Sequence, residues 1–291
     1  MSAAASIHEL EETTTLKPET VEDESGTVSE REALDKLTTL SPAATSGPLI
    51  AIDLDDVLCQ TNVAVAQWHN DTYGTEMKLS DFLYYYYWKN PYWGTPQETG
   101  AKVRDFYGTD RLYTTKPVPG AREGIQALKQ LGFRLIIVTA RYEDTADQSW
   151  KWVDHHFPGC FSSIICTGQF TDAHKTGHEV VTKLTKAQVC DDLKAVLLID
   201  DSAENAYSCV TAKKPIATLL FGDYEWNKRM CTHADAKHDM SFEARSKLEG
   251  GREYWKDETV PVPEGAPLWR VRDWSETVRW IKARKEEGRF D

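Results

Sequence analysis

The stretch that decides the fold is PLIAIDLDDVLCQTN, residues 48–62, in which an apolar run leads directly into three acids. The continuously apolar residues Leu49–Ile52 are typical of a strand buried on both faces of a parallel sheet. Asp53, Asp55 and Asp56 follow within four positions, and carboxylates this close to one another raise each other's pKa. Negative charge gathered at a strand end therefore predicts a site for a positive group, most simply a metal ion.

Similar apolar runs recur along the chain, with helical segments between them. The predicted strands are 49–54, 133–141, 161–168, 195–202 and 213–222, and the predicted helices include 124–132, 185–194 and 272–288. Short apolar runs that alternate with helices indicate a parallel sheet covered on both faces. We therefore predict an α/β fold with a Rossmann-like, three-layer core.

The predicted core is interrupted and preceded by segments of different character. Residues 1–47 hold ten acidic and three basic residues and few aromatics, which predicts a disordered acidic N-terminal tail. Residues 61–118, which we call the cap segment, are helical in pattern, aromatic and too long for a plain crossover loop. We expect them to form a small helical cap on a core made of residues 48–60 and 119–291. A second insertion, residues 230–265, suggests no function.

Composition excludes several classes of protein. The net charge of −12 argues against a general nucleic-acid binder, which normally presents a basic face. No segment approaches the ~20 apolar residues of a membrane span, and the first residues lack the basic start and apolar run of a signal peptide. The six cysteines include no CxxC pair that would suggest a zinc site. We expect a cytoplasmic protein that binds neither membranes nor nucleic acid.

Chemically active residue types follow the predicted strands and open one predicted helix. They are Asp53 and Asp55 after the first strand, Thr139 in the second, Lys186 at the start of the helix 185–194, and Asp200 and Asp201 in the fourth. Ligands of open α/β sheets bind at the carboxyl ends of the strands, so we expect these residues to meet at one edge of the sheet. Lys175 and Lys183 compete with Lys186, which is favoured by its place at the helix start.

This combination of motifs resembles the haloacid dehalogenase (HAD) superfamily of phosphatases over roughly residues 48–228. The segments KPVPGAREGIQALKQLGFRLIIVTAR, LLIDDSAENA, LLFGDYEWNKR and RVRDWSETVRWI are similar to the 5′(3′)-deoxyribonucleotidase-like branch, which has a helical cap between the first two motifs. Asp56 departs from that likeness, because the mammalian deoxyribonucleotidases have a small residue there. From the residues alone, a cap for the following turn is the favoured role of Asp56, and the alternatives are an acid that supports the metal ligands and a side chain that faces solvent.

The resemblance implies a mechanism and a Mg²⁺ cofactor. Asp53 is expected to attack phosphorus and form an aspartyl-phosphate, with Asp55 as general acid and then general base. Thr139 and the amide of Ala140 are expected to hold a phosphoryl oxygen, and Lys186 to neutralise negative charge. The expected metal ligands are Asp53, Asp55 through its backbone carbonyl, and Asp200 or Asp201, because Mg²⁺ prefers oxygen ligands.

The substrate is expected to be a small phosphorylated metabolite, with a nucleoside monophosphate as the guess that the resemblance implies. The alternatives are a sugar-phosphate phosphatase, a protein phosphatase and a non-catalytic HAD-fold interaction protein. Arg141, Tyr86 and Trp88 are candidate substrate contacts, since aromatic faces can hold nucleobases. A salt bridge at the surface is an equal alternative for Arg141, and core packing is favoured for most of the aromatic run 84–88. A monomer and a homodimer both remain open.

Overall fold

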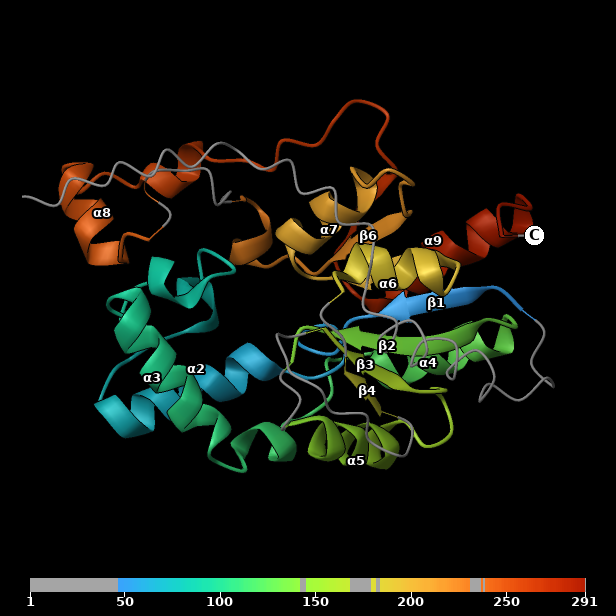
Figure 1. The fold of residues 1–291 in the computed structure, drawn as a ribbon, viewed down its shortest axis with the longest axis horizontal. Coiled ribbons are helices and arrows are strands. Elements are labelled where there is room, and N and C mark those ends of the chain that lie inside the picture. The colour runs from blue at the N-terminus through green and yellow to red at the C-terminus, as the bar shows by residue number, and fades with distance from the viewer. Residues whose placement is uncertain are drawn as a thin grey trace, which may run out of the picture.

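The structure is a computed structural model that describes residues 47–141, 145–167, 179–181, 184–230, 237 and 239–290. The predicted tail, apart from Gly47, and the competing candidates Lys175 and Lys183 lie outside these residues. A sheet of parallel strands in the order β4-β3-β2-β1-β5-β6-β7 forms the centre of the described chain (Figure 1). The strands are β1 (Leu49–Ile52), β2 (Arg134–Thr139), β3 (Ile164–Cys166), β4 (Glu179–Val181), β5 (Ala195–Asp200), β6 (Thr218–Phe221) and β7 (Leu268–Val271).

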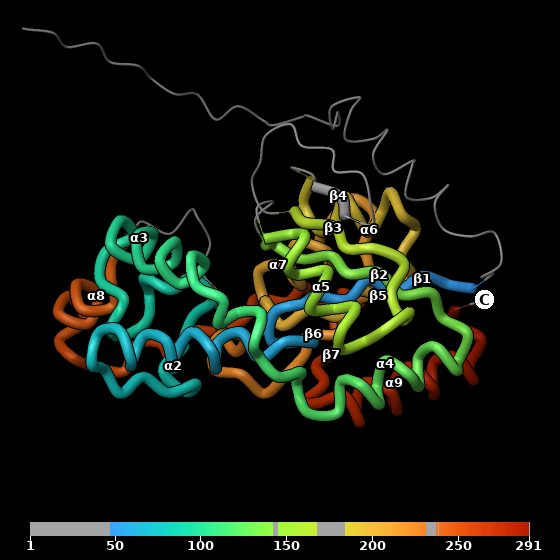
Figure 2. Tube along the Cα trace, turned by 90° about the horizontal axis from the view of Figure 1, so that it is seen from below, coloured from blue at the N-terminus to red at the C-terminus, as the bar shows by residue number. Residues whose placement is uncertain are grey.

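Helices cover both faces of the sheet, as the apolar runs predict. One face packs against α4 (Ala121–Gln130), α5 (Ala146–His156) and α9 (Trp274–Glu286), and the other against α6 (Lys186–Asp192) and α7 (Ala203–Val210) (Figure 2). Alternate residues of β1 serve the two faces: Ile50 and Ile52 belong to the first core, and Leu49 and Ala51 to the second. The three-layer α/β prediction is confirmed.

Two strands, β4 and β7, were not predicted. Because β4 precedes it, the strand expected as the fourth is β5 in chain order. The edge strand β7 reads LWRV and is partly exposed, so it lacks the continuous apolar run that marks the central strands. The other missed strand, β4, is three residues long and lies at the opposite edge. Edge strands are held by one neighbour only, and their sequences carry a weaker signal.

The cap segment lies beyond the carboxyl ends of the strands and is helical, as expected (Figure 1). Its elements are α2 (Thr61–Tyr73), α3 (Pro96–Tyr107) and the 3₁₀ turns η1 (Leu79–Asp81), η2 (Tyr87–Lys89) and η3 (Arg111–Thr114). A separate apolar cluster holds these elements together, and it includes Trp68, Phe82, Trp93, Phe106 and, from beyond β6, Trp226. The division of the chain into cap and core domains stays a prediction.

The second insertion packs against the cap segment. Its helix α8 (Phe242–Leu248) lies next to the cap segment in both views (Figures 1 and 2). Its 3₁₀ turn η6 spans Tyr254–Asp257. Tyr254 packs with Leu83 and Tyr84, and the Tyr84 hydroxyl donates to Glu258 Oε2 at 2.6 Å. Arg229 reaches the same place from the core and donates to the carbonyl of Leu83 at 2.6 Å. Two parts of the chain that follow β6, Arg229 and the insertion, therefore pack against the cap segment.

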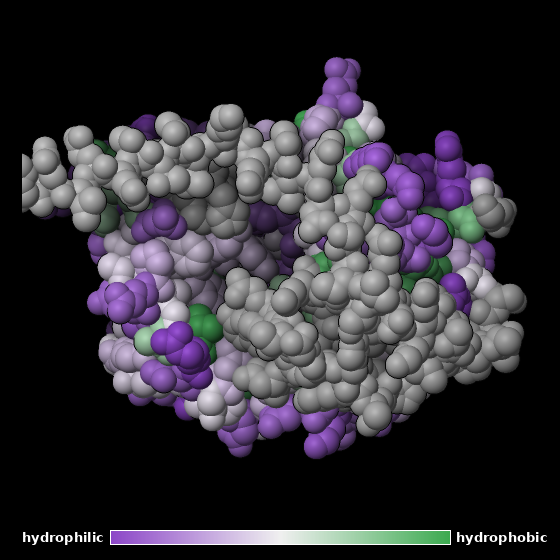
Figure 3. All heavy atoms as spheres, in the orientation of Figure 1, coloured by the Kyte–Doolittle hydropathy of each residue, from purple (hydrophilic) through white to green (hydrophobic). Residues whose placement is uncertain are grey.

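The described surface in the view of Figure 3 is mostly hydrophilic, with hydrophobic residues in small separate areas. No helix within the described ranges has the length and apolar character that crossing a bilayer requires.

Candidate active site

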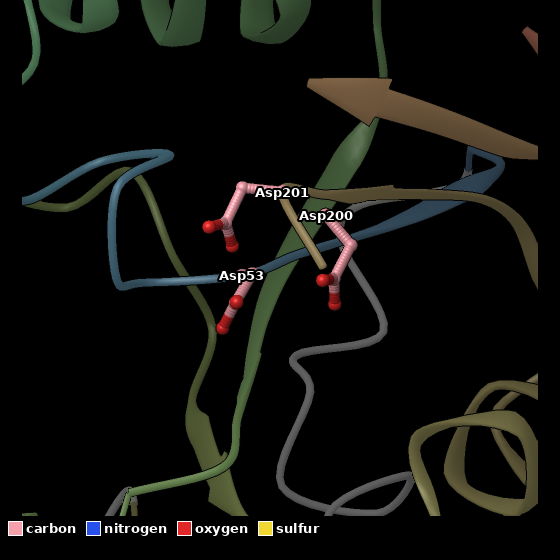
Figure 4. A group of neighbouring side chains, drawn as sticks. All are labelled: Asp53, Asp200 and Asp201. Carbon is pink, nitrogen blue, oxygen red and sulfur yellow. The ribbon is translucent and has the colours of Figure 1, made fainter. Parts of the chain in front are cut away.

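Three carboxylates meet where β1 and β5 end side by side. Ile52 of β1 is in register with Ile199 of β5, so the next residues, Asp53 and Asp200, emerge at the same level. Figure 4 shows these two side chains with Asp201, and one carboxylate oxygen from each lies within 4.8 Å of the others. All three are buried. The first and fourth predicted motifs therefore come together.

Lys186 neutralises part of this charge from the first turn of α6. Thr185 caps that helix, because its side chain accepts from the backbone N–H of Gln188, and this fixes Lys186 as the first helical residue. The Lys186 ammonium lies 2.9 Å from Asp53 Oδ1 and 2.7 Å from Asp200 Oδ2, and its side chain is 3% exposed. Lys186 thus lies at the start of its helix, as the sequence pattern predicts.

One lysine does not balance the three acids. Burial raises the pKa of Asp53 to about 7, against the opposing effect of the Lys186 charge. Burial, together with the charges of Asp53 and Asp200, raises the pKa of Asp201 well above its ordinary value. Carboxylates whose ionised forms are disfavoured in this way gain most from an added cation.

Asp200 and Asp201 differ in how their oxygens are used. Asp200 Oδ2 accepts from Lys186, and Asp200 Oδ1 accepts from the backbone N–H of Ser202 at 2.9 Å. Asp201 Oδ2 accepts from the indole N–H of Trp226 at 2.6 Å, and Asp201 Oδ1 has no hydrogen-bond partner among the described residues. Asp53 Oδ2 is equally open within the described chain, since the Leu54 amide and Lys186 both contact Oδ1.

Asp55 is held from another direction, by Arg141. The guanidinium Nε lies 3.1 Å from both oxygens of Asp55, and Nη2 lies 2.7 Å from Oδ1. Nη1 donates to Ser149 on α5 at 2.9 Å, and the Thr61 hydroxyl at the start of α2 also donates to Asp55. Although burial acts in the opposite direction, the charge and hydrogen bonds of Arg141 hold the pKa of Asp55 below its ordinary value.

The surface salt bridge considered for Arg141 is thus excluded by burial, since the Arg141 side chain is 1% exposed. Its expected role as a substrate contact stays a prediction, because its guanidinium is committed to Asp55 and Ser149 in this structure. Thr139 lies beside the same pair: its hydroxyl accepts from the Arg141 amide at 3.2 Å and is 3.4 Å from Asp55 Oδ2. Ala140, between them in sequence, is exposed.

Asp56 has the capping role expected of it. Its backbone is in the left-handed region, with φ of 53°. Its carboxylate accepts from the backbone N–H of Asn62 at 3.1 and 3.2 Å, in the first turn of α2. Gln60, at the formal N-cap, makes no side-chain capping bond, so Asp56 takes over that function.

The aromatic run of the cap segment is buried or half-buried, and the roles of Tyr86 and Trp88 as substrate contacts stay predictions. The rings of Tyr86 and Trp88, the expected substrate contacts, are half-buried and lie 4.8 Å apart, one against the other. Burial, and then the charges of Asp53 and Asp200, raises the pKa of Tyr85 well above its ordinary value, so the Tyr85 phenol is within electrostatic range of these two carboxylates. Nothing in a run of four tyrosines distinguishes Tyr85 beforehand.

Two further contacts near the site were not predicted. Trp226 contacts Asp201, and the Tyr224 hydroxyl donates to the Asp56 carbonyl at 2.8 Å. The segment LLFGDYEWNKR contributed to the family resemblance without any role for its aromatic residues. A tryptophan shortly after a strand that ends beside the site is the signal that could have found this contact.

Comparisons with known proteins agree with the motifs. A family model described as "5′ nucleotidase, deoxy (Pyrimidine), cytosolic type C protein" matches residues 47–236, more than half of the chain. The sequence matches no curated protein.

Several solved structures are similar in fold at low identity. A predicted phosphatase from Clostridium acetobutylicum is 13% identical with a TM-score of 0.47, over 81% of this chain and 99% of that one. A HAD family hydrolase from Deinococcus radiodurans R1, solved with bound phosphate and sodium, is 13% identical with a TM-score of 0.45, over 84% and 98%. L-2-haloacid dehalogenase from Xanthobacter autotrophicus is 12% identical with a TM-score of 0.45, over 81% and 99%. Because these TM-scores are below 0.5, the likenesses support no conclusion about activity.

Proposed function

The chain belongs to the family of 5′ nucleotidase, deoxy (pyrimidine), cytosolic type C proteins, which is a HAD-type phosphatase family. On this premise, we propose that it hydrolyses a deoxynucleoside monophosphate with Mg²⁺ through an aspartyl-phosphate. The observation that carries the proposal is the arrangement at the end of β1 and β5. A buried carboxylate, Asp53, keeps one oxygen open, with Lys186 on one side and the open oxygen of Asp201 nearby.

The residues present fit a divalent cation. Two buried carboxylates, Asp53 and Asp201, each keep an oxygen without a partner among the described residues, and burial raises the pKa of both groups. These two side chains and the backbone carbonyl of Asp55 would hold the ion, whereas Asp200 is occupied with Lys186 and Ser202. Mg²⁺, when bound, supplies positive charge that offsets the charges of the phosphate and the carboxylates.

The first half of the proposed reaction uses Asp53 and Asp55. A carboxylate oxygen of Asp53 attacks phosphorus, and the bond from phosphorus to the ester oxygen breaks. The leaving oxygen takes a proton from Asp55, and the phosphoryl group remains on Asp53. Arg141 and Thr61 hold the Asp55 carboxylate in one orientation for this transfer.

The second half uses the same residues in reverse. Asp55, now ionised, takes a proton from a water molecule whose oxygen attacks phosphorus, and the bond to Asp53 breaks to release inorganic phosphate. The lowered pKa of Asp55 favours its ionised form, which acts as the base in this half. The same shift opposes the protonated form that the first half uses, so the proton taken from water here is the one available to the next leaving oxygen. Lys186, Thr139 and the amide of Ala140 are proposed to hold the phosphoryl oxygens throughout.

The cap segment supports a small substrate. It lies beyond the carboxyl ends of the strands (Figure 1). Within it, the Tyr85 phenol is in electrostatic range of Asp53 and Asp200. A cover of this kind excludes large substrates and water. The pyrimidine deoxynucleotide substrate and the cytosolic location are both taken from the family description, and they are proposals for this chain.

The proposal is tested by measuring phosphate release from deoxynucleoside monophosphates, sugar phosphates and p-nitrophenyl phosphate, with Mg²⁺ and with EDTA. Wild type is compared with Asp53→Asn and with Asp257→Asn, which changes a carboxylate that is 69% exposed and far from the site in sequence. We expect Mg²⁺-dependent release that is greatest for a deoxynucleotide, lost in Asp53→Asn and kept in Asp257→Asn. Preference for a sugar phosphate would overturn the substrate class, and equal activity in Asp53→Asn would overturn the mechanism.

A further inference from the structure

Trp226 connects the apolar cluster of the cap segment with the acids of the core. It lies in the 3₁₀ turn η5 (Glu225–Asn227), which follows β6, and it is 1% exposed. Its ring belongs to the cap-segment cluster and lies edge-on to Phe82, with ring centres 6.2 Å apart and planes at 78°. Its indole N–H donates to Asp201 Oδ2 at 2.6 Å. One side chain thus contacts both a proposed metal ligand and the interior of the cap segment.

The turn that carries Trp226 is fixed by several contacts. Tyr224 stacks on Trp226 with ring centres 4.2 Å apart and planes within 8°, and its hydroxyl donates to the Asp56 carbonyl at 2.8 Å. Gly222 allows this stacking, because a Cβ atom there would lie 2.1 Å from the Tyr224 ring. Asn227 donates to the carbonyls of Phe221 and Gly222 at 2.9 and 3.1 Å. The indole therefore has little freedom to leave Asp201.

An indole N–H donates and never accepts, so its effect on Asp201 is directional. It occupies Oδ2 and leaves Oδ1 as the oxygen available to a cation. Partners that orient a metal ligand in this way commonly affect metal affinity 10–100-fold. Since Trp226 is also packed within the cap segment, any displacement of that packing moves the donor that orients Asp201.

We infer that Trp226 is a positioning residue that links the packing of the cap segment to the affinity of the Mg²⁺ site. The inference rests on the proposed function only in the identity of the ion. A change that loosens the apolar cluster around Trp226 should weaken Mg²⁺ binding. Because the coupling free energy between two sites acts equally in both directions, bound Mg²⁺ should in turn stabilise the cap segment.

The test is the Kd of Mg²⁺ for the full chain, measured by titration calorimetry without substrate. Trp226→Phe removes the N–H and keeps an aromatic ring, and Phe82→Leu loosens the cluster without touching Asp201. Trp280→Phe, a matched change on α9 beside Trp269, is the control. We expect the Kd to rise about 10–100-fold in Trp226→Phe and several-fold in Phe82→Leu, and to stay unchanged in the control.

The outcomes separate the parts of the inference. A Kd for Trp226→Phe within twofold of wild type would overturn the positioning role. A raised Kd in Trp226→Phe with an unchanged Kd in a folded Phe82→Leu would overturn the link to the cap segment. If Trp226→Phe does not fold, Tyr224→Phe, which keeps the stacked ring and loses the bond to the Asp56 carbonyl, takes its place with the same expected direction. Because no substrate is used, failure to hydrolyse any phosphomonoester would count against the proposed function and leave this result intact.

Discussion

Replacing Lys186 by methionine should strongly destabilise the protein in the absence of metal. The ammonium lies 2.9 Å from Asp53 and 2.7 Å from Asp200, and all three side chains are buried. Methionine keeps the length of the side chain and removes its charge, which leaves two buried carboxylates without compensation. Removing one partner of a buried ion pair costs about 3–5 kcal/mol of the free energy of unfolding. The melting temperature should fall by about 6–20 °C.

The assay is urea unfolding followed by tryptophan fluorescence in EDTA. The control is Lys214→Met, because Lys214 is 69% exposed and its ion pair with Asp191 at 2.9 Å should contribute at most about 1 kcal/mol. Added Mg²⁺ should restore part of the loss in Lys186→Met, in proportion to the logarithm of its concentration above Kd. A loss in EDTA no larger than that of Lys214→Met would refute the view that Lys186 offsets buried charge.

Four further substitutions test other parts of the structure. In EDTA, the protonated form of Asp53 stabilises the fold, and this contribution is lost as the pH rises through its folded pKa of about 7. Between pH 5 and 8, the free energy of unfolding of wild type should therefore fall by roughly 3 kcal/mol more than that of Asp53→Asn in urea titrations. An equal pH dependence in the two proteins would contradict this. Asp55→Asn should lower phosphate release by about 10²–10⁴-fold and keep Mg²⁺ binding, as calorimetry would show. Arg141→Lys cannot reproduce the contacts to both oxygens of Asp55, so kcat should fall by about 10²-fold. An unchanged kcat would contradict the orienting role. Gly124→Ala would place a Cβ 2.4 Å from the Trp274 ring, so thermal unfolding should show a loss of about 1–3 kcal/mol with kcat unchanged in the folded protein.

The frame of the candidate site could be predicted because each of its residues has a local sequence signal. Asp53 and Asp200 directly follow or end apolar runs, Thr139 ends another, and Lys186 follows the helix cap Thr185. Parallel pairing of the strands then brings these positions to one edge of the sheet, and this does not depend on the conformation of the connecting loops. Local signals together with the rules of α/β topology therefore determine this part of the site.

The contacts made by the surrounding side chains could not be predicted in the same way. Arg141 pairs with Asp55 across 86 residues and Trp226 with Asp201 across 25, and both pairings depend on the path of a turn rather than on an apolar pattern. Which of the four consecutive tyrosines lies in electrostatic range of Asp53 depends on the rotation of a short irregular segment, for which periodicity carries no information. The short edge strands β4 and β7 were missed for the related reason that few neighbours constrain them.

The way that distant parts of the chain meet in the cap segment has a consequence for folding during synthesis. Trp226 completes an apolar cluster whose other buried members lie between residues 64 and 112, and Tyr254 packs on Leu83 and Tyr84. The cap segment therefore emerges from the ribosome long before the residues that finish its interior. Contacts so far apart in sequence slow folding and leave apolar surface exposed in the meantime. In a nascent chain that stops before residue 226, the cap segment should be incompletely packed. Its exposed apolar surface would then be a binding site for a chaperone.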